Sequence, residues 1–292
     1  MNLKHISIYI LLFFSIQKSY SQNYFVNGDA SVTSVDGCYQ LTSSSNWELG
    51  SVWYANKLDL SKSFDLEFEL YFGDKDNGAD GIVFVLQTAG NNALGLPGGG
   101  LGFEGFSPSL GIEFDDWNNQ DLGDIPADHI AILKNGSVNH NGTDAISAPV
   151  AAIESNGNIE DGQNHLVRIT WNAQLSLLEV WFDCKIRQSI TTDIIDSIFD
   201  GKTSVFWGFT SSTGGANNTH IACLSDNIYV SDSLFICAGQ EIQLNSRKSS
   251  NEQYTWDPNV FLDDNSIQNP VCDALETTTY HVSYLDQCNQ KQ

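Results

Sequence analysis

Short runs of alternating apolar and polar residues cover much of the chain, and turn-forming residues separate them. From Phe64 to Phe72, every second residue is Phe or Leu, and the residues between them are mainly acidic. A period of two predicts a β-strand with one buried side and one side facing solvent. Similar runs lie at Val167–Trp171 and Leu178–Phe182, whereas Ile82–Leu86 is continuously apolar, which predicts a strand buried on both sides.

The same type of pattern continues to about residue 230. Val205–Phe209 and Ile228–Val230 complete the predicted strands, and only Thr191–Phe199 is a candidate for a short helix. The connecting segments are rich in Gly, Asn, Asp and Ser, which favour turns. Many short strands joined by such turns predict an all-β fold, either a two-sheet sandwich or a barrel.

Acidic residues gather in the stretch from Leu110 to Ile132. Ile112 and Phe114 would point to one side of a strand, and Glu113, Asp115 and Trp117 to the other; His129 then begins a second apolar alternation. Two strands and their loop therefore bring one polar group together: Glu113, Asp115, Asn119, Asp121, Asp124 and His129. Carboxylates at this density repel one another, so a cation is the simplest way to hold them. An imidazole among carboxylates suits a transition-metal ion, and the remaining oxygens suit calcium. The alternative is a solvated acidic loop.

This stretch resembles the metal-binding loop of the L-type (legume-type, concanavalin A-like) lectins. The family pattern is Glu-x-Asp-x-aromatic-x-Asn, then Asp, then His-Ile-x-Ile, and it falls on Glu113, Asp115, Trp117, Asn119, Asp124 and His129 without insertion or deletion. The resemblance implies a manganese-type ion on Glu113, Asp115, Asp124 and His129. It implies Ca²⁺ on Asp115, the Trp117 carbonyl, Asn119 and Asp124. It also selects the sandwich, a jelly roll of two antiparallel sheets.

Three further segments resemble the family's sugar-binding loops. In Ala79-Asp80-Gly81 the family Asp follows a cis peptide bond, and Asp80 would accept charge-assisted hydrogen bonds from two sugar hydroxyls. The Gly98–Gly102 loop would supply a backbone N–H at Gly99, since glycine allows close approach. The Thr210–Asn218 loop would contribute Gly214, Gly215 and Ala216, and the Trp117 ring would offer an apolar plate. An ordinary turn Asp, a flexible glycine hairpin and a core Trp are the alternatives.

The ends of the chain differ in composition from the middle. Residues 1–21 read as a secretory signal peptide, with Lys4, an apolar run at Ile6–Ile16, and small residues before a cut ahead of Gln22. Without Lys4 and Lys18 the net charge of −23 becomes −25, which argues against nucleic acid and anionic membranes as partners. We expect a secreted or cell-surface protein without membrane insertion. The predicted domains are an L-type lectin domain at 22–230 and a module at 231–292.

The C-terminal segment resembles the small immunoglobulin-like modules of gliding Bacteroidetes surface proteins, in the phrases TWDPNVFLDDNSIQNPV and ETTTYHVSY. The six cysteines contain no CxxC pair, and in an exported chain they indicate disulfides whose pairing the sequence leaves open among fifteen schemes. The module resemblance implies Cys237–Cys288. The lectin resemblance implies Cys38–Cys223, because the first and last strands of that sandwich are neighbours. Cys184 and Cys272 are then left over.

The function we expect is calcium-dependent binding of glycans, without enzymatic activity. A glycoside hydrolase on a similar sandwich is the first alternative. Such hydrolases carry the pattern Glu-x-Asp-x-x-Glu, and this chain has Asn118 where the pattern needs its second Glu. A retaining hydrolase needs two carboxyl groups about 5 Å apart. A structural surface module whose metal loop only stabilises the fold is the second alternative. The joint presence of Asp80, Gly99 and Asn119 favours a working sugar site.

Overall fold

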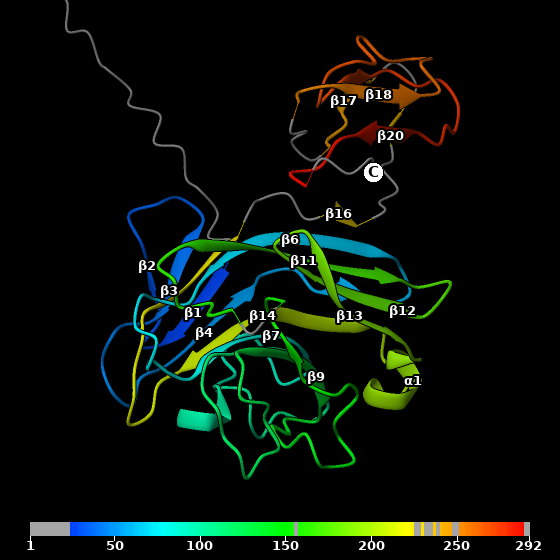
Figure 1. Ribbon diagram of the computed structural model, residues 1–292. Coiled ribbons are helices and arrows are strands. Elements are labelled where there is room, and N and C mark those ends of the chain that lie inside the picture. The colour runs from blue at the N-terminus through cyan, green and yellow to red at the C-terminus, as the bar shows by residue number, and fades with distance from the viewer. Residues whose placement is uncertain are drawn as a thin grey trace, which may run out of the picture.

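The structure, a computed structural model, describes residues 24–154, 157–224, 229–230 (backbone), 236–237, 240–246 and 251–288. Two large antiparallel sheets lie face to face, and the small C-terminal strands lie beyond the second of them (Figure 1). This arrangement confirms the predicted all-β sandwich. The predicted signal peptide at 1–21 falls outside the described residues.

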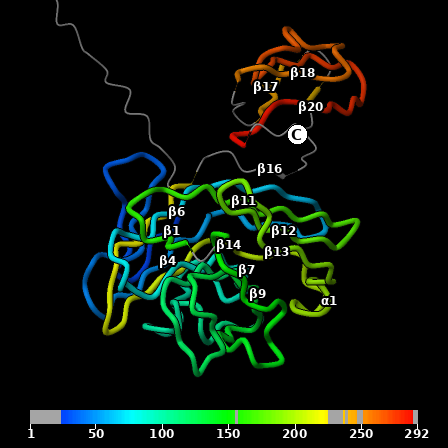
Figure 2. The backbone as a smooth tube through the Cα atoms, viewed as in Figure 1, coloured from blue at the N-terminus to red at the C-terminus, as the bar shows by residue number. Residues whose placement is uncertain are grey.

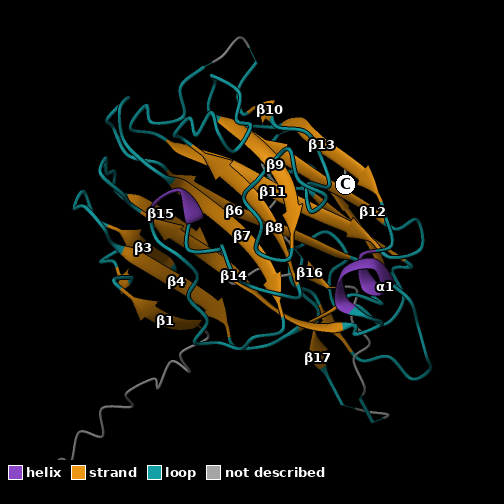
Figure 3. Ribbon diagram, turned by 90° about the horizontal axis from the view of Figure 1, so that it is seen from below, coloured by secondary structure: helices purple, strands orange, loops and turns teal. Residues whose placement is uncertain are grey.

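Figure 3 shows the strands of the first sheet side by side. The candidate site lies at the ends of these strands and in the loops that follow them. Its order is β1 (Tyr24–Gly28), β4 (Leu49–Tyr54), β14 (Ser204–Ser212), β7 (Gly81–Gln87), β8 (Ser109–Asp115), β9 (His129–Lys134) and β10 (Val150–Ala151), with β5 (Leu58–Asp59) paired to β14. Strands β7 to β10 follow one another along the chain, whereas β14 lies between β4 and β7, so loops from distant segments meet at the ends of this sheet.

The second sheet packs against the first. Its order is β13 (Lys185–Thr191), β12 (Leu177–Phe182), β11 (Asn164–Asn172), β6 (Phe64–Tyr71), β15 (His220–Leu224), β3 (Cys38–Thr42) and β2 (Ser31–Val32), with β16 (Tyr229–Val230) paired to β6. Along β6, buried and half-buried residues alternate as predicted. Phe68 of β6 meets Phe84 and Phe209 of the first sheet at ring-centroid distances of 5.9 and 4.8 Å. These contacts form the core between the layers.

The central strands of the first sheet are buried on both faces. Every residue of β7 and β8 is buried. On the outer face, Leu101 and Phe103 from the glycine-rich loop pack against Val83 and Val85. This loop contains η1 (Gly98–Gly100), a single 3-10 turn. Because the loop folds over the sheet, it is held against the loop that follows β8.

The predicted helix is present, and the C-terminal segment also contains strands. Helix α1 (Ile194–Phe199) begins after Asp193, whose side chain accepts a hydrogen bond from the Asp196 N–H. At the C-terminus, β17 (Ile242–Gln243) pairs with β19 (Val271–Cys272), and β18 (Tyr254–Asp257) pairs with β20 (His281–Tyr284). Figure 2 follows the chain into these strands. The immunoglobulin-like assignment and the domain boundaries remain predictions.

The disulfides confirm one predicted pair and correct the other. Cys38 and Cys223 are bonded, and they are directly opposite each other on β3 and β15. The expected Cys237–Cys288 pair is wrong, because Cys288 is bonded to Cys184, whereas Cys237 and Cys272 are free thiols. Cys184 occupies the two-residue turn between β12 and β13, where it and Asp183 both have the positive φ that this hairpin turn requires.

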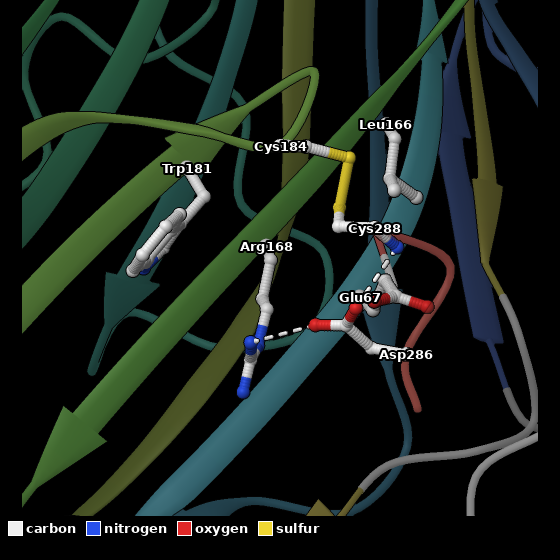
Figure 4. A pocket seen from close by; sticks show the side chains of 7 residues that line it. All are labelled: Glu67, Leu166, Arg168, Trp181, Cys184, Asp286 and Cys288. Carbon is white, nitrogen blue, oxygen red and sulfur yellow. Dashed lines mark hydrogen bonds and ion pairs between the residues drawn. A yellow bond between two sulfur atoms is a disulfide. The ribbon is translucent and has the colours of Figure 1, made fainter. Parts of the chain in front are cut away.

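Charged residues explain why the end of the chain reaches that turn (Figure 4). Arg168 on β11 forms a bidentate pair with Asp65 and lies 3.5 Å from the buried Asp286 carboxylate. Gln287 donates a hydrogen bond to Glu67 at 3.2 Å. The segment before Cys288 is therefore held on the second sheet, beside Cys184.

Candidate functional site

Strand register brings the predicted metal ligands together. Asp115 at the end of β8 is opposite His129 on β9 and opposite Gly81 on β7. The loop between β8 and β9 returns over this point. Glu113 and Asp115 are 1% and 4% exposed, so the acidic face of the strand is covered rather than solvated. The alternative of a solvated acidic loop is therefore wrong for these two residues.

Hydrogen bonds within the loop fix its carboxylates. Asp115 Oδ1 accepts from the Trp117 N–H at 2.7 Å, and Asp124 Oδ2 accepts from the Asn119 N–H at 2.5 Å. His129 Nε2 lies 3.5 Å from Glu113 Oε1 and 3.9 Å from Asp124 Oδ1.

A second histidine, His140, completes this cluster, and sequence reasoning missed it. Its Nε2 lies 2.8 Å from Glu113 Oε1 and 3.2 Å from Asp124 Oδ1, and its side chain is 2% exposed. The backbone N–H of His140 donates to the Leu122 carbonyl at 2.9 Å. This bond holds the loop of His140 against the connection between β8 and β9 (residues 116–128), which we call the metal loop. His140 lies in the polar segment after β9, where neither periodicity nor the family pattern singles it out.

The cluster fits a bound cation. Two sets of side chains offer ligand atoms within 4.8 Å of one another: Glu113, His129 and His140, and Asp115, Asp124 and His129. Glu113 Oε1 and His129 Nε2 are buried, and the ion-pair contacts that they form lie within this cluster. Burial, together with the charges of Glu113 and Asp124, raises the pKa of Asp115 well above its ordinary value. Such groups are costly to bury unless positive charge compensates them.

Residues from four loops meet beside the metal loop. A Cβ atom placed on Gly99 would lie 3.2 Å from Asn119 Oδ1. A Cβ atom placed on Gly214 would lie 3.3 Å from Asp80 Oδ2 and 3.5 Å from the Gly98 Cα. Larger residues at Gly99 or Gly214 would therefore crowd the two polar side chains. The structure brings Asp80, Gly99, Asn119 and Gly214 together, as the sequence predicted, and Ala79–Asp80 is a cis peptide.

Three consecutive hydroxyl side chains at the end of β14 hold these loops. Thr210 donates to the Leu101 carbonyl at 3.0 Å, Ser211 to the Gly81 carbonyl at 2.7 Å, and Ser212 to the Gly98 carbonyl at 2.8 Å. All three are fully buried. Because buried hydroxyls need partners, they fix both the glycine loop and the Asp80 turn to the same strand.

The remaining predicted residues are Gly215, Ala216 and Trp117. Gly215 is exposed with open space around it, and Ala216 is half-buried. Trp117 is 39% exposed, so the core alternative does not apply to it. Its ring lines a cavity of about 320 Å³ with Asp76, Asp116 and Asp128 among the other walls.

Asp80 has the burial and the unpaired oxygen atom that are typical of a residue that binds a polar ligand. It is 4% exposed, and its Oδ2 forms no hydrogen bond with a described residue. Burial, and then the charge of Asp116, raises the pKa of Asp80 to about 7. A buried carboxylate oxygen without a partner favours a ligand that donates hydrogen bonds.

Glu160 is a second buried carboxylate, and it yields a stability prediction. Burial and the charges of Asp116 and Asp128 raise its pKa to about 9. The unfolded chain loses this proton near pH 4.5, so wild-type stability falls as the pH rises from there towards 9. Glu160→Gln keeps an acceptor for the Gly78 N–H and removes the charge. We expect a gain at pH 8 of at least about 1 kcal/mol, or at least about 2–4 °C in Tm, and a much smaller gain at pH 5.

Thermal unfolding of both proteins at pH 5 and pH 8, in EDTA, checks this prediction. Glu241→Gln, at an exposed position in the C-terminal segment, is the control and should change Tm equally at both pH values. A variant that is less stable than wild type at pH 8 would contradict the prediction and would indicate compensation of Glu160 by positive charge.

Comparisons with known proteins agree with this fold. A family model described as the legume lectin beta-barrel domain, of the L-type lectins, matches residues 16–226. The basic winged bean lectin with Tn-antigen has a similar structure, with a TM-score of 0.57 and 20% identity, covering 73% of this chain and 94% of that one. The VIP36 exoplasmic/lumenal domain, in a Ca²⁺/Man3GlcNAc-bound form, has a TM-score of 0.52 and 17% identity, covering 69% and 81%.

A curated relative matches over a shorter segment. The pesticidal crystal protein Cry22Aa of Bacillus thuringiensis is 32% identical over 93 residues, which is 32% of this chain and 13% of that protein. Among the described residues, no helix is long and apolar enough to cross a membrane. Because the lectin family model spans well over half of the sequence, the chain belongs to the L-type lectin family of carbohydrate-binding proteins.

Proposed function

We propose that this chain is an exported, calcium-dependent lectin that holds a sugar between Asp80, Gly99 and Asn119. The observation that supports it most is the unbroken series of contacts from Asp80 through Gly214 and Gly98 to Gly99 and Asn119, which come from four loops. A hexose presents neighbouring hydroxyl groups that donate and accept hydrogen bonds, and such a set of converging polar groups matches them.

Each residue has a distinct task in this proposal. The Asp80 carboxylate accepts hydrogen bonds from two neighbouring hydroxyls, and the Asn119 amide and Gly99 N–H donate to the sugar. Backbone groups of Gly214, Gly215 and Ala216 contact the remaining hydroxyls and set the preference among sugars. The Trp117 ring packs against the apolar face of the sugar.

The metal ligands act on this set indirectly. Ca²⁺ on Asp115, the Trp117 carbonyl, Asn119 and Asp124, with a manganese-type ion on Glu113, Asp115, Asp124 and His129, would compensate the buried charges and fix Asn119. The family and the fold support a binding rather than an enzymatic role, and Glu113 is 1% exposed and held between two histidines. We propose secretion or display at the cell surface, with glycan capture or adhesion as the role.

A glycan-array screen of residues 22–292 tests the proposal. The protein is applied in Ca²⁺ plus Mn²⁺ and again after EDTA, and we expect glycan-specific signals that EDTA abolishes. Signals that survive EDTA would contradict the metal dependence. Absence of binding in both conditions would contradict the lectin proposal and favour a structural surface module.

A further inference from the structure

The residues proposed to hold the transition-metal ion lie beside a second histidine, His140. The family pattern for this loop contains only one histidine, His129. The rings of His129 and His140 lie at 72° to each other with centroids 5.3 Å apart. Both approach the same carboxylate oxygens, Glu113 Oε1 and Asp124 Oδ1, within 3.9 Å. All four side chains are at most 2% exposed, so the ligand atoms are shielded from bulk water.

We propose that His140 is a second imidazole ligand of this position and that it shifts the preference of the site towards Zn²⁺ or Co²⁺ over Mn²⁺. Two imidazoles with two carboxylates suit zinc, cobalt and nickel, whereas sites made mostly of carboxylates, carbonyls and water suit manganese. The Nε2 atom of His140 faces the carboxylate oxygens of Glu113 and Asp124, at 2.8 and 3.2 Å, which is the position of a metal ligand in this cluster. This inference rests on the proposed metal dependence and makes it more specific.

Contacts with the metal loop hold the loop that carries His140 in place. Besides the bond from His140 N–H to Leu122, the Asn141 side chain lies against Gly123, where an added Cβ would be 2.4 Å from Asn141 Nδ2. Gly123 has a φ of 93°, which glycine adopts without strain. The metal loop and the His140 loop therefore pack directly on each other, and His140 is positioned before any ion binds.

Titration of the metal-stripped full chain tests His140. In constant Ca²⁺, calorimetry with Mn²⁺, Co²⁺ and Zn²⁺ should show binding of Zn²⁺ and Co²⁺ at least 100-fold tighter than Mn²⁺. His140→Ser should lower Zn²⁺ and Co²⁺ affinity at least tenfold, change Mn²⁺ affinity less, and alter the visible spectrum of bound Co²⁺. His281→Ser, an exposed histidine on β20, is the control.

The outcomes separate the two proposals. Equal affinities and superimposable Co²⁺ spectra for wild type and His140→Ser would overturn the ligand role and leave His140 as a positive charge that neutralises the carboxylates. Failure of the wild type to bind any of the three ions would overturn both this inference and the proposed metal dependence. Circular dichroism of the variant verifies that it is folded.

An independent observation concerns Trp47, in the loop between β3 and β4. This indole is 68% exposed, and its backbone has a φ of 63°, a conformation that bulky residues rarely adopt. Its Cζ3 lies 4.0 Å from the Cβ position of Gly98. Gly98 is next to Gly99 and contacts Gly214, so the ring lies immediately outside the Asp80–Gly99–Asn119 group.

Hydrogen bonds on both sides of Trp47 hold it there. Thr213 donates to the Ser45 carbonyl at 2.7 Å and accepts from the Glu48 N–H at 2.9 Å. The Asn46 side chain donates to the Gly215 carbonyl at 3.0 Å. The loop is thus attached to the segment proposed to set sugar preference. Exposure of a large apolar ring and an unfavourable φ both cost stability, and such costs often accompany a binding role.

We infer that Trp47 forms a subsite for the next pyranose ring of a glycan chain, whose apolar C–H face packs on the indole. Trp117 does not serve this position, because the cavity that it lines has no residue of the Trp47 loop among its walls. This inference also rests on the proposed lectin function and extends it from a single sugar to an oligosaccharide.

An array printed with monosaccharides and with the oligosaccharides that contain them tests Trp47. Trp47→Ala should lower oligosaccharide binding about tenfold and monosaccharide binding less than twofold, whereas Trp47→Phe should retain most of both. Leu175→Ala, at an exposed apolar residue between β11 and β12, is the matched control. Equal losses for both ligand classes, or no loss, would overturn the subsite. A wild-type protein that binds nothing would overturn the lectin proposal with it.

Discussion

Replacement of Asp80 by asparagine is expected to lower carbohydrate affinity at least 100-fold without loss of bound metal. Asparagine has the same shape, but its amide nitrogen donates where a sugar hydroxyl also donates. A ratio of 100 corresponds to about 2.7 kcal/mol, within reach of two charge-assisted hydrogen bonds. The variant should be at least as stable as wild type, because the repulsion between Asp80 and Asp116 disappears.

Calorimetry with the best glycan from the array, metal analysis and thermal unfolding measure these three effects. Asp36→Asn, at an exposed turn residue, is the matched control. Full sugar binding by Asp80→Asn would place the site elsewhere on the molecule. Loss of sugar together with loss of metal would mean that Asp80 supports the metal loop and does not contact the sugar.

Asp115→Asn is expected to reduce both metal occupancy and sugar binding below detection. Asp115 belongs to the ligand set of both proposed ions, and it lies between Gly81 and His129 in the sheet. Its effect on stability should depend on metal. In EDTA the variant should unfold at a higher temperature than wild type, because burial and the neighbouring Glu113 and Asp124 disfavour the charge of Asp115.

With Ca²⁺ and the preferred transition metal present, the order should reverse. Ions at about 100 times their dissociation constants stabilise the wild type by about 2.7 kcal/mol, or roughly 5–10 °C in Tm. Asp121→Asn, at an exposed acidic residue of the same loop, should behave like wild type in both buffers. If EDTA leaves the wild-type Tm unchanged, or if Asp115→Asn retains both ions, this account of the metal centre is refuted.

Local sequence pattern accounts for much of the fold. The alternation in Phe64–Phe72 predicted β6, the apolar run at Ile82–Leu86 predicted β7, and both agree with the observed burial. Such predictions succeed because a strand with one buried face needs a period of two, whatever its partners are. The resemblance to L-type lectins added the choice of a sandwich over a barrel, which the pattern alone left open.

The grouping of the candidate metal ligands was predictable for a related reason. Glu113, Asp115, Asn119, Asp124 and His129 all lie within one pair of adjacent strands and their connection, so chain connectivity alone brings them together. Asp80, Gly99 and Gly214 come from separate loops. They were found only because their segments resemble family motifs, and the hydroxyls of Thr210, Ser211 and Ser212 that fix those loops were not anticipated.

Only the tertiary structure decided the contacts that depend on distant segments. His140 reaches Glu113 because its loop packs on Gly123, and Trp47 reaches Gly98 because its loop is bonded to Thr213. Cys184 meets Cys288 because Arg168 and Glu67 hold the end of the chain on the second sheet. The sequence by itself determined the strands and the local ligand set, through periodicity and short spacing. The second imidazole, the exposed indole and the correct disulfide required the packing of loops, which leaves no periodic signal in the chain.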